Sequence, residues 1–277
     1  MLIILNLKAN GVLNPQKFKF VDSPGGAAFH FATEALLKMG AINEDGIVSA
    51  MGRVMLDFPV DPFSAFCLAN VIQENETIQN DIVTIIAILN AENFFLSLGR
   101  EKGQREGENR KRFVISNSDH LTKLNIFYKY CEAKNKKEFC QIFGLRKKTL
   151  ENCLMIREQL NEILQRIKAR MEGPNSQEER RPYVVAKNIS ILKALENVKI
   201  NYSFDRDKII RILQRSFFTR IAQLDHHGEY VINHINLRVK IHPESVIFAQ
   251  RVKPKKIVFN TIINTSKLYV SNASEVL

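Results

Sequence analysis

The stretch that decides the fold is Leu36-Leu37-Lys38-Met39-Gly40-Ala41-Ile42-Asn43-Glu44-Asp45-Gly46, which continues to Gly52-Arg53 and Phe58-Pro59-Val60-Asp61-Pro62. The glycine at position 40 predicts the end of a helix, and Pro59 predicts the end of a second, shorter helix that Ser49 caps. Between the two helices, the turn from Asn43 to Gly46 can close a small hairpin. Two helices joined through a small hairpin in this order predict a winged-helix unit.

From Pro62 to Met171 the chain is predicted to be mainly helical, because its apolar residues recur at steps of three and four. The polar stretch from Gly99 to Arg112 interrupts it and predicts an exposed loop or surface helix. We expect a helical bundle built on three apolar sets. They are Ile78, Ile82, Ile85, Ile86 and Leu89; Leu121, Leu124, Tyr128 and Cys131; and Cys153, Ile156, Leu160, Ile163 and Ile167.

Beyond the linker composition Glu172-Gly173-Pro174-Asn175-Ser176, the apolar period changes to the alternation of strands. One helix, Arg206 to Arg220, precedes these strands. The pattern predicts a small antiparallel barrel of about five strands, and it leaves an OB-fold and an SH3-like barrel both open. The alternating residues are Tyr230 and Ile232; Leu237, Val239 and Ile241; and Ile257 and Phe259.

The fold class is therefore multidomain, mainly α-helical with a C-terminal β-barrel. We divide the chain into 1–22, 23–62, 63–172 and 173–277: a leading segment, a winged helix, a helical bundle, and a barrel with its preceding linker. The leading segment holds one short helix, Leu2 to Asn10, and has no core of its own. We expect a chain that begins inside a larger domain.

The net charge and the cysteines indicate what kind of partner and compartment to expect. Lys and Arg number 40 against 29 Asp and Glu, which gives a net charge of +11 and favours a polyanionic partner such as nucleic acid. The last hundred residues carry 17 Lys and Arg against 9 Asp and Glu, so the excess is concentrated there. The four cysteines form no zinc-finger pattern and predict buried free thiols in a reducing compartment. No apolar run is long enough to span a membrane, and we expect a soluble intracellular protein.

Two histidine-containing patterns suggest chemistry. Asp119 and His120 are adjacent on a predicted helix, where neighbouring side chains point about 100° apart, so we expect Asp119 to interact with backbone N–H groups at the helix start and His120 to pack locally. A second group surrounds one predicted hairpin, but it lacks the ligand spacing of a metal site, so we expect turn and strand surface residues. This group is His226, His227, His234 and His242.

No sequence motif predicts nucleotide hydrolysis or covalent catalysis. The chain contains no phosphate-binding loop, and its glycines at 99, 103 and 107 lie among charged residues without a strand-to-helix context. Basic residues with aromatic neighbours are more informative: Arg211, Arg215 and Arg220 surround Phe217 and Phe218. A further group, Arg251, Lys253, Lys255 and Lys256, leads into Phe259. We expect the phenylalanines to belong to the core, while phosphate contact by the cations stays open.

The order of these motifs resembles the DEAH-box RNA helicases, especially their pre-mRNA-splicing members. Ala35 to Asp45 and Phe58 to Pro62 are similar to the winged helix of that family, and Ser118-Asp119-His120-Leu121 is similar to the Gly-Asp-His-Leu segment of its helical "ratchet" domain. Ile156-Arg157-Glu158-Gln159-Leu160 is similar to another ratchet segment. Phe217-Phe218 and Val239 to Ser245 are similar to motifs of its OB-fold. Among the departures, Ser118 and Ser216 stand where the family has glycine, Lys148 where it has arginine, and Phe139 where it has tryptophan.

The resemblance implies a C-terminal accessory module of an ATP-dependent RNA helicase, with residues 1–22 as the end of a second RecA-like motor domain. In the family, such modules close a channel over single-stranded RNA and dock glycine-rich-patch activator proteins, while ATP and Mg²⁺ act in the motors. It also implies a nuclear, spliceosomal location. This chain lacks the motor motifs, so we expect no catalytic residue, no resident cofactor and no ATPase activity from it alone. The RNA-binding candidates are Arg215, Lys240, Arg251 and Lys253.

Two other functions stay open at this point. The first is a stand-alone RNA-binding or adaptor protein derived from a helicase that lost its motor domains. The second is a DNA-binding winged helix, which is weaker because Ser49 to Phe58, the helix that would enter the groove, carries Arg53 as its only basic residue.

Overall fold

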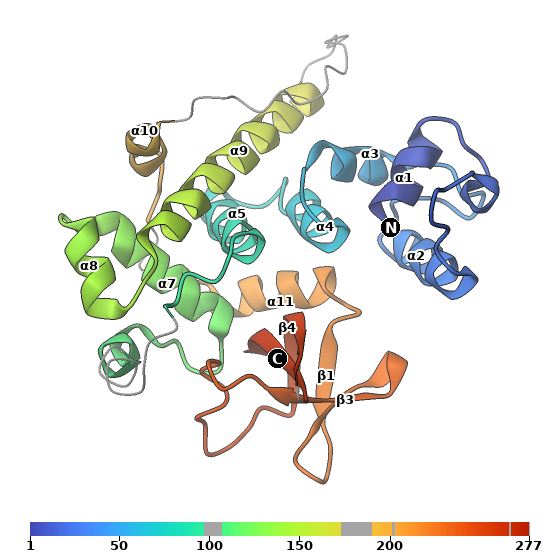
Figure 1. Ribbon diagram of the computed structural model, residues 1–277. Coiled ribbons are helices and arrows are strands. Elements are labelled where there is room, and N and C mark those ends of the chain that lie inside the picture. Colours follow the sequence, from blue (N-terminus) through green and yellow to red (C-terminus); the bar gives the residue numbers. More distant parts are fainter. Residues whose placement is uncertain (97–106, 173–189, 201–202, 266, 277) are drawn as a thin grey trace. The chain divides into compact units, whose positions relative to one another are not determined.

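The computed structural model describes residues 1–96, 107–172, 190–200, 203–265 and 267–276 (Figure 1). The chain forms two compact units. The first contains Met1–Gln73 and the described residues from Glu162 onward in the long helix α9 (Lys147–Glu172). The second contains Glu74–Asn161 and the described residues from Ser190 onward. The predicted linker lies outside the described residues from position 173, and the predicted division of the chain into four parts stays a prediction.

The first unit is helical and contains the predicted winged helix. Gly40 follows the first helix of the wing motif with φ of 66°, a left-handed conformation that glycine adopts without steric cost. Ile42 and Val48 pair across the turn, as the hairpin prediction required. Ser49 caps the next helix by accepting a hydrogen bond of 3.0 Å from the Gly52 amide. The helices are α1 (Leu2–Ala9), α2 (Gly26–Lys38), α3 (Ala50–Asp57) and α4 (Pro62–Asn70), with a 3₁₀ turn at Pro15–Lys17.

The winged helix depends on a close approach of α3 to the hairpin, and Gly52 makes that approach possible. A Cβ atom at this position would lie 2.1 Å from the carbonyl oxygen of Ala41 and 2.9 Å from a methyl carbon of Val48. Both distances are far below van der Waals contact, and the first involves backbone that cannot rotate away.

We expect Gly52→Ala to lower the free energy of unfolding of the first unit by ~1–3 kcal/mol, the usual cost of overpacking. Urea unfolding followed by circular dichroism measures the change. Gly25→Ala is the matched control, because a Cβ atom there meets nothing within 4 Å. Equal unfolding midpoints for Gly52→Ala and Gly25→Ala would contradict the close approach.

Most of the predicted apolar residues of the bundle are buried, although Leu89, Cys131 and Ile156 are only half-buried. Ile82, Ile86 and Leu124 are fully buried, and Ser118 caps its helix by accepting a hydrogen bond from the Leu121 amide. One feature was not predicted: Phe95 pairs with Leu145 in an isolated β-bridge, which ties the segment after α5 to the turn before α9. The helices are α5 (Glu76–Asn90), α7 (Asp119–Glu132), α8 (Lys136–Phe143), α9 as far as Asn161, α10 (Ile191–Glu196) and α11 (Arg206–Ser216), with a 3₁₀ turn at Lys111–Phe113. The predicted loop at Gly99 to Arg112 lies outside the described residues up to position 106.

A closed five-stranded barrel completes the second unit, in the order β1-β2-β3-β5-β4. Four of the strand pairs are antiparallel, as expected, but β3 and β5 pair in parallel, with Lys240 opposite Tyr269. The reason is geometric: strands that alternate in direction cannot close a ring with an odd number of members. The strands are β1 (Ile221–Leu224), β2 (Tyr230–Ile232), β3 (Leu237–Ile241), β4 (Lys256–Asn264) and β5 (Leu268–Glu275), with a 3₁₀ turn at Asn233–Ile235.

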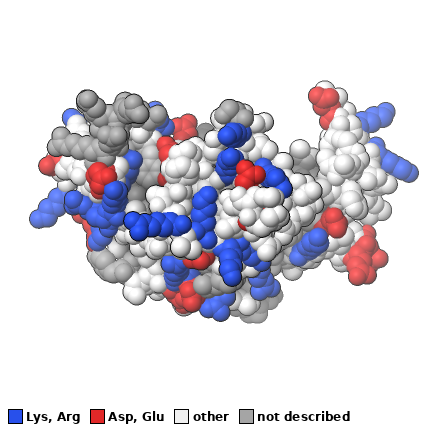
Figure 2. Space-filling model, turned by 90° about the horizontal axis from the view of Figure 1, so that it is seen from below, with Lys and Arg blue, Asp and Glu red and all other residues white. Residues whose placement is uncertain are grey.

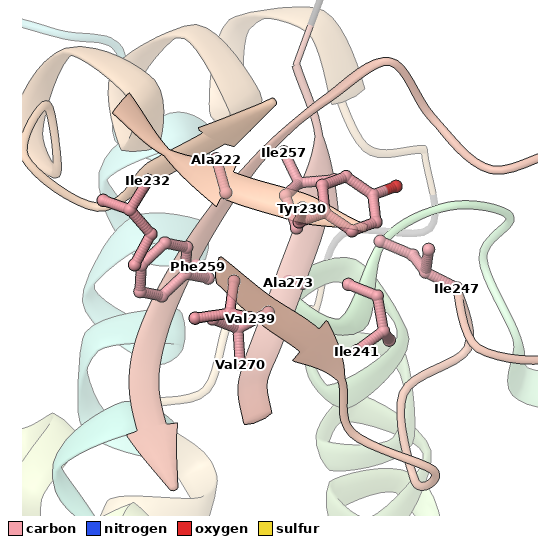
Figure 3. Packing of buried hydrophobic residues seen from close by; sticks show 10 residues of the cluster. All are labelled: Ala222, Tyr230, Ile232, Val239, Ile241, Ile247, Ile257, Phe259, Val270 and Ala273. Carbon is pink, nitrogen blue, oxygen red and sulfur yellow. The ribbon is translucent and has the colours of Figure 1, made fainter. Parts of the chain in front are cut away.

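The barrel has its own apolar core, which Figure 3 shows, and Phe259 and Val239 lie within it. Tyr230 is buried there, and its hydroxyl donates a hydrogen bond of 2.7 Å to the Pro254 carbonyl, so the polar end of the ring is satisfied. Figure 1 shows α11 lying across the barrel. This helix ends at Ser216, four residues before the predicted end, because the buried Phe217 leaves helical geometry at φ −99° and ψ 39°. None of the described helices combines the length and the apolar character needed to cross a membrane.

Candidate nucleic-acid interface

The four predicted RNA-binding residues lie on three elements of the second unit, and all four are exposed. Arg215 is in the last turn of α11, Lys240 is on β3, and Arg251 and Lys253 are on the connection between β3 and β4. No contact among the described residues brings the four side chains together. Figure 2 shows Lys and Arg side chains distributed over the face on the barrel side of Figure 1, with Asp and Glu among them.

OB-folds commonly bind oligonucleotides on the outer face of β2 and β3. In this barrel, the positive charges of that face are paired with acidic residues of the same barrel. Lys240 forms an ion pair of 3.4 Å with Glu229, and Arg238 lies 3.8 Å from Asp225 and 3.9 Å from Glu229. In contrast, Arg215, Arg251 and Lys253 make no ion pair with any described acid. These three side chains are therefore better placed than Lys240 to meet a phosphate.

The aromatic neighbours of the basic residues belong mainly to the core, as expected. Phe217 and Phe259 are 0% and 1% exposed, so neither ring can stack on a base. Arg220 is structural, because its guanidinium lies over the Phe217 ring and donates a hydrogen bond of 2.9 Å to the Asn260 carbonyl. Phe218 is half-buried.

The start of α7 docks directly onto the barrel, a contact that was not predicted from the sequence. The Asp119 carboxylate accepts hydrogen bonds of 2.8 Å from the amides of both Val246 and Ala273, which lie 127 and 154 residues further along the chain. The expected contact with backbone N–H groups is present, but these groups belong to the barrel and not to the helix of Asp119. The sequence does contain an indication of this contact. One capping residue is enough for a helix start, and Ser118 already caps α7, so Asp119 is an acidic residue that the cap itself does not need.

His120 continues the same junction, and the expectation that it packs locally is wrong. Its Nδ1 lies 2.6 Å from the Ser274 hydroxyl and its Nε2 lies 2.5 Å from the Asn260 amide oxygen, so one ring bridges β5 and β4. Ser118 joins the group through a hydrogen bond of 2.7 Å to Ser274. We call Ser118, Asp119, His120, Asn260 and Ser274 the junction cluster.

Burial controls the protonation of the junction cluster. It lowers the pKa of His120 to about 4, which keeps the ring neutral at pH 7. Burial also raises the pKa of the Asp119 carboxyl, against the opposing effect of the hydrogen bonds from Ala273 and Val246. The cluster is therefore held by directed hydrogen bonds rather than by a His–Asp ion pair.

A cavity of about 260 Å³ opens beside this junction. Lys123 lies one helical turn after Asp119 and contributes its ammonium, which is 2.5 Å from the Asn272 amide oxygen. Burial lowers the pKa of Lys123, while the charges of Asp119 and Glu244 oppose that shift. Phe94 and Phe95 form an apolar wall, with the Lys123 ammonium 5.8 and 5.5 Å from the two ring centres.

The predicted histidine group does not converge. His226 and His227 are exposed on the β1–β2 turn with their rings 3.9 Å apart, while His242 follows β3 and packs edge-on against Tyr269. His234 is exposed in the 3₁₀ turn after β2. Among the residues that the structure describes, no three His, Cys, Asp or Glu side chains are grouped so that they could hold a metal ion.

Comparison with known proteins agrees with this architecture. Residues 32–60 match a family described as the helicase associated domain (HA2), winged-helix, and residues 209–277 match the oligonucleotide/oligosaccharide-binding (OB)-fold family. The second match resolves the choice between an OB-fold and an SH3-like barrel, and both confirm the predicted fold class.

Curated relatives match almost the whole chain. It is 26% identical over 275 residues to the probable ATP-dependent RNA helicase DHX35 of Pongo abelii, an alignment that covers 99% of this chain and 34% of that protein. The chain is 27% identical to the pre-mRNA-splicing factor ATP-dependent RNA helicase prp22 of Schizosaccharomyces pombe, and this alignment covers 99% of the chain and 21% of that protein. For the ATP-dependent RNA helicase DHX33 of Drosophila melanogaster the identity is 25%, and the alignment covers 94% of the chain and 33% of that protein. The chain thus spans about a third or less of the length of these relatives.

The low pKa of His120 makes the stability of the second unit depend on pH. The unfolded chain takes up a proton near pH 6.5 and the folded chain only near pH 4, so this stabilisation is complete above 6.5 and is lost as the pH falls toward 4. The loss amounts to roughly 3 kcal/mol over that interval. Urea unfolding between pH 7.5 and 4.5 measures it. His120→Gln should flatten the dependence, and substitution of the exposed His226 by Gln should not. Identical profiles for the two variants would exclude the buried neutral ring.

Asp119→Asn tests the other half of the junction. The side-chain amide of asparagine accepts hydrogen bonds through its oxygen and not through its nitrogen. The backbone N–H of either Val246 or Ala273 therefore loses its partner. We expect a loss of about 2 to 3 kcal/mol in unfolding free energy at pH 7. Chemical unfolding measures the loss, and Asp207→Asn on the exposed side of α11 serves as the control. A change no larger than that of the control would show that the carboxylate does not hold the barrel.

Proposed function

We propose, from the premise that this chain corresponds to the helicase-associated C-terminal region of a DEAH-box RNA helicase, that it is an accessory module that holds single-stranded RNA. The observation that carries the proposal is the direct docking of the OB-fold barrel on the start of α7. Asp119 and His120 make that docking through hydrogen bonds to β4, β5 and the β3–β4 connection. A barrel fixed in this way can transmit force between bound RNA and the helices.

The exposed cations of the barrel region supply the contact with RNA in this proposal. Arg215, Arg251 and Lys253 have no acidic partner among the described residues, and phosphate oxygens are the natural partners of such groups. Lys240 joins them only if its pairing with Glu229 opens. Contacts of this kind hold the backbone of RNA without reading its sequence.

The remaining parts of the proposal concern a longer protein. RecA-like motor domains that bind ATP and Mg²⁺ would be partners within that protein, and a glycine-rich-patch protein would be an activator. One relative is named as a pre-mRNA-splicing factor, which supports a role in splicing or ribonucleoprotein remodelling in the nucleus. Within the chain itself we propose no catalytic residue.

A second candidate function is a free-standing RNA-binding adaptor derived from a helicase without its motors. The exposed barrel cations suit it equally, so the genomic sequence upstream of Met1 decides between the two. A reading frame that encodes a phosphate-binding loop and a DEAH box supports the helicase, and a stop codon in that frame supports the adaptor.

Removing the three unpaired cations tests RNA holding. We expect the triple variant Arg215→Ala/Arg251→Ala/Lys253→Ala to bind a single-stranded RNA oligonucleotide more weakly. The slope of log affinity against log salt should fall by about 0.7 for every phosphate that is no longer neutralised, which is about 2 for three side chains. Fluorescence anisotropy at several salt concentrations measures both quantities.

The control for this experiment removes the same charge from the first unit, in Lys17→Ala/Lys19→Ala/Lys38→Ala. All three of these lysines are exposed. If the two triple variants have the same affinity and the same salt slope, the barrel cations are not the RNA contacts.

A further inference from the structure

We propose that the cavity beside the junction cluster accepts one nucleobase of bound RNA, and that it favours guanine. The inference rests on the proposed RNA-holding function and deepens it, because it assigns a base-reading site to a module otherwise expected to hold the RNA backbone. Four observations on the second unit carry the argument: the size of the cavity, its aromatic wall, its charged and polar groups, and one residue with a strained backbone.

The size and the wall of the cavity suit a flat aromatic group. About 260 Å³ is less than the 300–1,000 Å³ typical of pockets for drug-sized ligands, and it leaves room for one base. Phe94 and Phe95 form the wall, and unstacked RNA bases are commonly held against aromatic rings. Hydrogen bonds from Leu96 to Gly144 (2.9 Å) and from Arg146 to Phe94 (2.8 Å) fix the backbone that carries both rings.

The charged groups of the cavity disfavour an anion and suit a neutral ligand with both donors and acceptors. Lys123 brings one positive charge, while Asp119 and Glu244 bring two negative charges. A phosphate group would therefore meet net repulsion. A base avoids this penalty, because it is neutral and presents polar edges.

The hydrogen-bonding capacity of these groups matches one base edge. The Lys123 ammonium has three N–H donors, and Asn272 is its one hydrogen-bond acceptor among the described residues. Glu244 also lines the cavity, and it accepts a hydrogen bond of 3.1 Å from Asn93 through a single oxygen, which leaves acceptor capacity. The pairing edge of guanine places the O6 acceptor beside the N1–H and N2–H donors. Lys123 would donate to O6, and Glu244 would accept from the two N–H groups.

A strained backbone at Asn272 aims its side chain at this site. Its φ is 53°, which is unusual for a residue other than glycine and interrupts the extended conformation of β5. The strain places its amide oxygen on the Lys123 ammonium, which is thereby oriented before any ligand arrives. Strain of this kind clusters at functional sites, where the surrounding structure maintains it.

The test uses the 277-residue chain and three 12-nucleotide RNAs: oligouridine, and oligouridine with one central guanosine or one central adenosine. We expect the guanosine oligonucleotide to bind at least fivefold more tightly than the other two in fluorescence anisotropy, because a good side-chain–base pair contributes about 1–3 kcal/mol. Lys123→Met should abolish the preference and leave the affinity for oligouridine unchanged. Lys129→Met on the same helix is the matched control and should retain it.

A second variant protects the test against a folding defect at Lys123. Glu244 is exposed, so Glu244→Gln should fold normally and should also lose the preference for guanosine. Equal affinity for the three oligonucleotides, or a preference that survives both variants, overturns the base site while RNA holding stands. If none of the oligonucleotides binds, the proposed function itself fails. Titration with guanosine monophosphate separates the two sources of the base: comparable affinity for the free nucleotide overturns the assignment to RNA.

Discussion

The hydrogen bonds that Asp119 accepts from Val246 and Ala273 are the constraint on which the second unit depends. One carboxylate fixes two separate pieces of the barrel, the β3–β4 connection and β5. His120 adds β4 through Asn260. Hydrogen bonds are directional, so this arrangement sets the position and the rotation of the barrel on α7, which apolar packing alone would leave less defined. The cost is the burial of a charged group, and the two amide partners offset it.

The same junction shapes the cavity beside it. Lys123 lies four residues after Asp119 on α7, so both side chains lie on one face of the helix. On the barrel, Asn272 immediately precedes Ala273, whose amide Asp119 holds. A shift of the barrel along α7 would therefore separate Lys123 from Asn272 at the same time as it broke the hydrogen bonds of Asp119. Stability and the geometry of the cavity are linked through neighbouring residues on both elements.

Local features of the fold could be predicted from the sequence, and features that depend on distant partners could not. Gly40, the hairpin with Ile42 and Val48, and the Ser49 cap are each specified within about ten residues, and all of them are confirmed. Strand β5 was missed because Ala273 and Ser274 are both buried, which removes the alternation that marks a strand with one exposed face. Ala273 faces the barrel core, and Ser274 faces Ser118 and His120.

The pairing of charges likewise depends on distant residues and could not be predicted from the sequence. It also bears on how RNA would be held. An excess of basic residues in the last hundred positions is visible in the sequence, but it does not reveal which cations are paired. Arg238 and Lys240 lie two residues apart on β3, so they share one face of the strand, as binding of a single ligand would require. Glu229 on the neighbouring segment, however, lies close to both. The face most often used by OB-folds is thus partly neutralised from within. RNA held by this unit would therefore meet its unpaired cations on α11 and on the β3–β4 connection, which also carries Glu244 and Val246 of the cavity and junction. Backbone contact and base contact would then share one connection.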